Sequence, residues 1–301
     1  MGPQRRLSMF VGVAFAMASF ALGPQAGSAR AEMAAETPAD IGAGEALADI
    51  AVALQLDALF GVLREEGLAY GTTLEADMFP GGGGLFWSEA VSAIYDIKTM
   101  RARFDAAFAA ELNDQLQGDG PLVADAVAFF GSELGQRIVS LEIEARRAFL
   151  DTALEEAARV AADDRAGARD PLVRQLRRVI AAGDLLEMNV AAALSSNLAF
   201  MTGMSDSGLY GEGLPQDQIL DDVWADEAAL RDSSSLWLDA FLGLAYSPLT
   251  EAELDAYVLF VESPAGQRLN AALFAAYGAV YRQLSYDLGR AVGVAMLSRD
   301  I

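Results

Sequence analysis

The sequence lacks histidine and cysteine altogether and has a single lysine, Lys98, in 301 residues. Without histidine there can be no Ser-His-Asp or Cys-His nucleophile, no histidine zinc site and no histidine acid–base catalyst. Without cysteine there is no disulfide and no lipidated cysteine behind an export signal, so stability must come from a packed core. The chemistry that remains belongs to carboxylates, hydroxyls, tyrosines and arginines, and no cofactor is predicted.

The first 31 residues have the order of a cleavable export signal. Arg5 and Arg6 precede an uncharged apolar run at residues 9–22, and Ala29-Arg30-Ala31 supplies a small-residue cleavage site. The run is shorter than the ~20 residues that cross a bilayer. We therefore expect cleavage after Ala31, a flexible segment at 32–44, a periplasmic or secreted protein, and no membrane span in the mature chain.

Basic residues are scarce throughout the chain. There are 21 Lys and Arg residues against 43 Asp and Glu residues, a formal net charge of −22. Loss of residues 1–31 removes three arginines and no acids, which leaves −25. Such a surface repels nucleic acid and anionic lipid, so the expected partner is a basic protein segment or a cationic ligand.

Helical periodicity dominates what is present. Apolar residues in the second half recur at the i, i+3, i+4, i+7 spacing of one buried helix face, and no alternating run typical of a strand occurs. The residues that carry this pattern are Leu254, Tyr257, Val258 and Val261, followed by Leu269, Leu273, Ala276, Val280, Leu284 and Leu288. The sequence predicts an all-α fold.

Two corners interrupt the helical pattern. Ser263 is a good N-cap and Pro264 fits the first helical position, so one helix should end near Val261 and another begin at once. Ser132 holds the same place in an earlier copy, and Thr250 with Glu253 is typical of a capping box. We expect each corner to join a short helix to a long one.

The two corners align with a constant offset of 131 residues. The aligned residues are Phe129, Ser132, Gly135, Gln136 and Arg137 in the first copy, and Phe260, Ser263, Gly266, Gln267 and Arg268 in the second. The alignment predicts two tandem helical modules packed as a bundle-like array, at 45–165 and 170–298, with a seam at 162–171. Glycine in the first helical turn costs up to ~1 kcal/mol relative to alanine, which indicates that another helix crosses close to it. Each arginine opposes the helix dipole and should pair with a carboxylate.

The second corner resembles a known family. An aromatic residue followed by Ser-Pro-x-Gly-Gln-Arg-Leu and a long amphipathic helix is similar to the domain-of-unknown-function 2059 family of exported bacterial proteins. Phe260, Ser263, Pro264, Gly266 and Gln267 carry the resemblance, which covers the last sixty residues, and the first module is linked to it by the internal repeat. The resemblance implies an all-helical periplasmic domain and no catalytic residues.

Two glycine-rich segments are the candidate binding elements. Residues 79–87, with the sequence FPGGGGLFW, lack the lysine and the preceding strand of a phosphate-binding loop and are read as a flexible loop. Its counterpart at 205–215 also carries an aromatic residue. Phe86, Trp87 and Tyr210 are therefore the predicted contacts for a partner, in a groove that both loops border.

Acidic residues offer the remaining candidate chemistry. Residues 217–227 could bind a cation through oxygen ligands, but they lack the spacing of a calcium loop and are read as a solvated helix face. The preferred function is a binding or interaction module of the cell envelope. The alternative is a histidine-free hydrolase that uses carboxylates in a groove between the modules.

Overall fold

The computed structural model describes residues 48–211 and 213–298, and every regular element in those ranges is a helix. The predicted all-α fold is confirmed. The signal peptide, its cleavage site and the segment at 32–44 lie outside the described residues. In chain order the helices are α2 (Leu56–Met78), α3 (Gly84–Ile94), α4 (Ile97–Gly131), α5 (Glu133–Ala148), α6 (Thr152–Ala168), α7 (Pro171–Ala182), α8 (Leu185–Asp206), α9 (Gln216–Ala225), α10 (Glu227–Tyr246), α11 (Glu251–Val261) and α12 (Pro264–Leu297).

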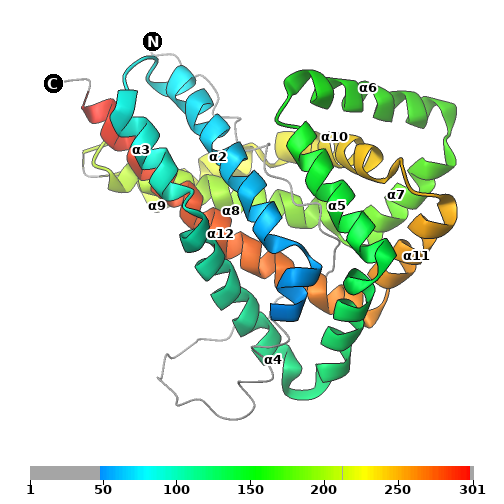
Figure 1. Cartoon of the computed structure of the whole chain (residues 1–301). Coiled ribbons are helices and arrows are strands. Elements are labelled where there is room, and N and C mark those ends of the chain that lie inside the picture. Colours follow the sequence, from blue (N-terminus) through cyan, green and yellow to red (C-terminus); the bar gives the residue numbers. More distant parts are fainter. Residues whose placement is uncertain (1–47, 212, 299–301) are drawn as a thin grey trace.

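Helix α12 is the axis of the molecule. It runs from the corner after α11 to the opposite end and packs mainly against α8 and α4, with further contacts to α2 and α3 (Figure 1). The apolar stripe predicted from Leu269 to Leu288 is buried at each of its six positions. Because α12 touches helices from both predicted modules, it organises the whole core.

The two predicted modules share one hydrophobic core. A single cluster of buried side chains runs from Ile50 to Ala295 and includes residues on both sides of the seam at 162–171. Helix α10 likewise packs against α5 and α6 of the first predicted module. The division into two modules related by a repeat stays a prediction, and the packing shows that neither half buries its apolar face alone.

Helices α8 and α12 touch through their backbones. A Cβ atom on Gly203 would lie 2.1 Å from the carbonyl oxygen of Tyr286, and one on Gly289 would lie 2.1 Å from that of Phe200. Neither contact leaves room for a side chain, so glycine is required at both positions. The sequence pattern did not predict this crossing, because the two glycines are 86 residues apart.

Both corners have the predicted caps. The Ser132 hydroxyl accepts from the Gly135 amide and the Ser263 hydroxyl from the Gly266 amide, each at 3.1 Å. The capping box at the start of α11 is also present, with Thr250 as its N-cap. Local sequence therefore sets where these helices begin.

The close approach predicted at the corner glycines is present, and its partner is the helix just completed. A Cβ atom on Gly135 would lie 2.1 Å from the Phe129 carbonyl oxygen, and one on Gly266 would lie 2.2 Å from that of Phe260. At each corner the chain turns back so tightly that the first turn of the second helix packs against the last turn of the first helix, α5 against α4 and α12 against α11.

The expected helix lengths hold for one corner only. In the second copy α11 has 11 residues and α12 has 34, as predicted. In the first copy the order is reversed, since α4 has 35 residues and α5 has 16. The expectation was wrong there because α5 ends early, where Asp151 caps α6 by accepting from the Ala153 amide at 2.8 Å.

The predicted seam ends in a sharp turn. Helix α6 continues to Ala168, Arg169 takes a left-handed conformation with φ of 57°, and Asp170 caps α7.

Among the described residues no single helix is long and apolar enough to span a membrane. Helices α7 and α8, which are bent by 55° relative to one another, together have the length and the composition of a span, and nothing else marks them as one.

Candidate functional site

The structure separates the three aromatic residues predicted to bind a partner. Phe86 is 61 % exposed and Tyr210 is 40 % exposed, but Trp87 is only 2 % exposed. The Trp87 indole N–H donates to the Gly71 carbonyl at 2.8 Å, and its ring packs edge-on against Phe79 at 4.9 Å. The expectation that Trp87 is accessible is therefore wrong, because this side chain anchors α3 to α2.

The two glycine-rich segments lie at one end of the molecule. Figure 1 shows the α2–α3 connection and the segment after α8 on the side where α12 ends. Gly81 and Gly84 have positive φ, as do Gly208, Gly211 and Gly213 in the second segment, so both turns need glycine. A shared groove between them stays a prediction.

The acidic segment at 217–227 forms most of α9. Ile219 and Val223 turn inward, whereas Asp217, Asp221 and Asp222 are exposed. No group of three or more acidic side chains arranged to hold a metal ion was found in the described part of the chain. The interpretation as a solvated helix face agrees with this placement.

Arg137 makes the pairing predicted for it. Its guanidinium donates to the Glu253 carboxylate at 2.5 Å and to the Pro248 carbonyl at 2.7 Å. Glu253 is also the capping-box residue of α11, so the first corner is tied directly to the start of the second. For Arg268 the pairing stays a prediction.

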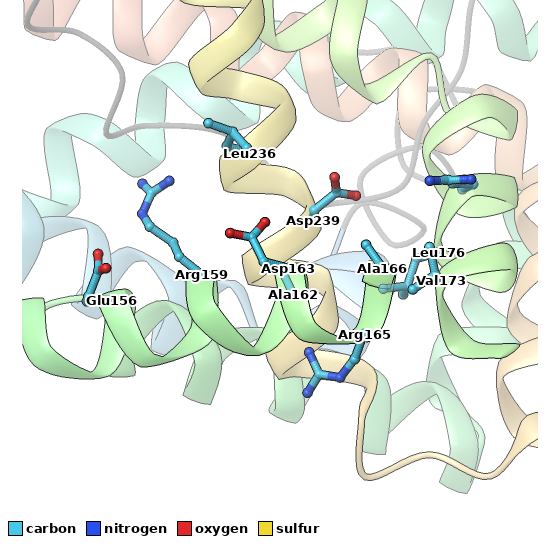
Figure 2. Close-up of a pocket in the computed structure, with 11 residues that line it drawn as sticks. Glu156, Arg159, Ala162, Asp163, Arg165, Ala166, Val173, Leu176, Leu236 and Asp239 are labelled. Carbon is cyan, nitrogen blue, oxygen red and sulfur yellow. The ribbon is translucent and has the colours of Figure 1, made fainter. Parts of the chain in front are cut away.

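A cavity of about 240 Å³ lies where α6, α7 and α10 meet (Figure 2). Helix α6 belongs to the first predicted module and the other two helices to the second. The wall combines short apolar side chains with three acids and three arginines. The lining residues are Glu156, Arg159, Ala162, Asp163, Arg165, Ala166, Val173, Leu176, Arg177, Leu236 and Asp239.

Two carboxylates dominate the middle of this cavity. Asp163 comes from α6 and Asp239 from α10, and both line the cavity (Figure 2). Burial raises the pKa of Asp239, Arg177 lowers it, and the neighbouring Asp163 raises it. Asp239 is half-buried whereas Asp163 is exposed, and the repulsion between two like charges favours the protonated form of the buried one.

The three arginines of the cavity wall differ in how they interact with the two aspartates. Arg159 is paired with Glu155, outside the lining, at 2.6 Å. Arg165 points away from the two aspartates in Figure 2, and its guanidinium lies 2.8 Å from where a Cβ of Gly243 would stand. Arg177 is the cation that acts on Asp239. Of the three arginines, Arg177 is therefore the one that offsets the charge of Asp239.

Sequence reasoning did not select Asp163 or Asp239 as site residues. They are two of 43 acids and stand 76 residues apart, so no local motif joins them. The one sequence feature that could have indicated this site is the predicted seam at 162–171, which contains Asp163. A site between two modules has to be lined by residues from both sides of the seam.

Comparison with known proteins identifies one segment of the chain. Residues 98–164 match the family described as an uncharacterized protein conserved in bacteria, DUF2059. The resemblance expected from the corner motif is confirmed, and the match falls on the first copy rather than on the last sixty residues. It spans α4, α5 and most of α6, including Asp163. No curated protein and no solved structure matches the chain.

Proposed function

We propose that this chain, which carries a DUF2059 segment, is an exported protein of the bacterial cell envelope that binds a small organic cation between α6, α7 and α10. The observation that carries the proposal is that Asp163 of α6 and Asp239 of α10 line the same cavity and lie close enough for one to raise the pKa of the other. The net charge of −22 supports it, because an acidic surface raises the local concentration of cations.

The shape and lining of the cavity suggest what such a ligand looks like. At about 240 Å³ the space is smaller than the roughly 300–1,000 Å³ of typical drug-sized sites, which favours a ligand of few atoms. An ammonium group would lie between the aspartates. A short hydrocarbon chain would lie against Val173, Leu176 and Leu236. A small aliphatic amine, or the side chain of a lysine in a basic protein segment, has this chemistry.

Calorimetric titration with 1,4-diaminobutane tests the proposal. The mature protein should bind the diamine and not 1,4-butanediol, which has the same chain without the charges. Asp239→Asn should weaken binding by tenfold or more, since a hydrogen bond to a charged group contributes about 1.5–3 kcal/mol. The matched control is Asp221→Asn on the exposed face of α9, which should leave affinity unchanged. Equal binding of diamine and diol would reject the site.

A lysine-containing peptide separates the two sources of the amine. If the natural ligand is a basic protein segment, the peptide should bind more tightly than the diamine, and Phe86→Ala or Tyr210→Ala should weaken only the peptide. These two exposed aromatic residues stay the proposed contacts for a larger partner. Loss of affinity only in the aspartate variants would assign the ligand to the cavity alone.

A hydrolase is the second candidate, and the same pair of aspartates favours it. Acid–base hydrolysis needs two carboxyl groups with different proton affinities, and burial already raises the pKa of Asp239. A panel of chromogenic esters and glycosides tests this function. Asp163→Asn and Asp239→Asn should each abolish turnover, whereas turnover that survives both changes would place the chemistry elsewhere.

Export is proposed from the N-terminal sequence. Protein recovered from the periplasm of an expressing bacterium should begin at residue 32, after Ala31. N-terminal sequencing decides the point, and a recovered chain that still begins at Met1 would contradict the export signal.

A further inference from the structure

A carboxyl group buried in the core joins three helices. Glu142 of α5 is only 4 % exposed. One of its carboxyl oxygens accepts from the Tyr246 hydroxyl of α10 at 2.6 Å and from the Tyr257 hydroxyl of α11 at 3.3 Å. The two tyrosine rings also pack edge-on at 5.5 Å. Glu142 therefore sits where α5, α10 and α11 meet.

The nearest cation on the same helix is engaged elsewhere. Arg146, one turn after Glu142, pairs with Glu66 of α2 at 2.6 Å and at 2.8 Å through a second nitrogen. It also donates to the Tyr281 hydroxyl of α12 at 3.3 Å. Arg146 is itself only 6 % exposed, so this ion pair is part of the core.

The groups that face Glu142 are thus mostly neutral. They are Tyr246 from α10, Tyr257 from α11 and Tyr277 from α12. The charged groups nearby are Arg146 on its own helix, Glu66 beyond that arginine, and Arg101 of α4, which acts on Tyr277. Burial raises the pKa of Tyr246 well above its usual value and that of Tyr277 as well, so both hydroxyls keep their protons. Hydroxyl donors favour the carboxylate through their hydrogen bonds, but they carry no positive charge to offset the cost of burying it.

We infer that Glu142 is a proton-dependent latch: protonated, it lets α5, α10 and α11 pack without a buried charge, and its ionisation places an unbalanced charge at that junction and loosens it. The helix that it holds, α10, also carries Asp239 and Leu236 of the cavity. The latch does not depend on the proposed binding function, since it concerns the cohesion of the core.

The direction of the pH effect follows from the proton affinity. Burial raises the pKa of Glu142 from 4.5 to about 8, against the lowering effect of the two tyrosine hydrogen bonds. Between these values the folded protein holds a proton that the unfolded chain has lost. The contribution of Glu142 to stability is therefore complete below pH 4.5 and is lost as the pH rises through about 8.

Urea unfolding of the mature protein at a series of pH values from 5 to 9 tests the latch. The folding equilibrium constant of the unaltered protein should fall with rising pH by up to about tenfold per unit below pH 8. Glu142→Gln, which keeps the shape and stays neutral, should remove that part of the slope. Glu144→Gln is the matched control, because this exposed residue lies on the same helix and shares only the general repulsion among surface acids.

A second variant keeps the test decisive if Glu142→Gln does not fold. Tyr246→Phe removes the hydroxyl at 2.6 Å, which favours the ionised form, so the pH at which stability is lost should move upward. Hydrogen exchange above pH 8 should speed up first in α5, α10 and α11. Equal pH slopes in the unaltered protein and Glu142→Gln, or an unshifted transition in Tyr246→Phe, would overturn the inference.

Discussion

The corner at Ser132 and the corner at Ser263 have the same local structure, but the helices that they join differ in the order of their lengths. The cap residues have nearly equal backbone angles, with φ and ψ of −71° and 162° at Ser132 and −79° and 158° at Ser263. The long helix nevertheless precedes the first corner and follows the second. The difference teaches that cap, first-turn glycine and turn geometry are local properties, whereas helix length depends on what each helix packs against.

The two corners also pack against one another. Phe129 and Phe260, which occupy equivalent positions in the predicted repeat, stack at 4.0 Å with an interplanar angle of 8°. Phe130 meets Phe260 edge-on at 5.3 Å. Contact between equivalent residues is what a two-fold relationship between the halves would produce, as at an isologous dimer interface.

The largest expected effect comes from filling the space at the corner glycines. Gly135→Ala and Gly266→Ala should each destabilise the protein by about 3 kcal/mol, the upper part of the range for overpacking, because each new Cβ meets a carbonyl oxygen. Gly131→Ala is the control, since nothing lies within 4 Å of its Cβ position. Chemical denaturation measures all three. A large cost at one corner and none at the other would break their equivalence.

The next effect distinguishes the two glutamines. The Gln136 amide donates to the Ala53 and Phe130 carbonyls, both at 2.6 Å, whereas Gln267 is exposed and reaches the Glu262 carbonyl only at 3.5 Å. Gln136→Ala should cost about 1–3 kcal/mol because it leaves half-buried carbonyls unpaired, and Gln267→Ala should cost almost nothing. Equal losses of unfolding free energy in urea titrations would show that the two glutamines contribute equally to stability in both copies.

A double-mutant cycle measures the contact between the corners. Phe129→Leu and Phe260→Leu should be coupled by about 0.5–1.5 kcal/mol, the range for aromatic pairs. Phe149 packs instead against Trp237 and Phe241, so Phe149→Leu combined with Phe260→Leu should be additive. Additivity in the first cycle would mean that the stacking contributes no stability of its own.

The smallest effect concerns the salt bridge between the corners. Arg137 is 44 % exposed and Glu253 is 30 % exposed, so Arg137→Ala should cost about 1 kcal/mol or less. Added salt should reduce the difference between variant and parent, because it screens exposed charges. A cost that is larger and insensitive to salt would assign the stabilisation to the bond with the Pro248 carbonyl.

The comparison of the corners shows which parts of the fold could be predicted. Ser132, Ser263 and Thr250 were identified as caps because a cap is formed by neighbours in the sequence. The burial of the α12 stripe followed from its periodicity. Trp87 was placed wrongly because its partner, Gly71, belongs to another helix, and α5 ended early because of Asp151. Local pattern therefore located the corners and the buried faces.

The residues of the candidate site could not be predicted from local sequence pattern. Asp163 and Asp239 form one site only because α6 and α10 pack side by side. Glu142 lies within α5, a helix whose other buried positions are mostly apolar. The charge of the chain indicated a cationic partner but could not select two acids from 43. Long-range packing decides which acids come close together, as Asp163 and Asp239 do, and which become buried, as Glu142 does, and that information is not local.

Location of a bound amine by nuclear magnetic resonance tests the central functional claim most directly. During titration of the mature, isotope-labelled protein with 1,4-diaminobutane, backbone amide signals should shift along α6, α7 and α10 around Asp163, Leu176 and Asp239. The shifts should disappear in Asp239→Asn. Shifts confined to the glycine-rich segments around Phe86 and Tyr210, or no shifts at all, would contradict a cation site between α6, α7 and α10.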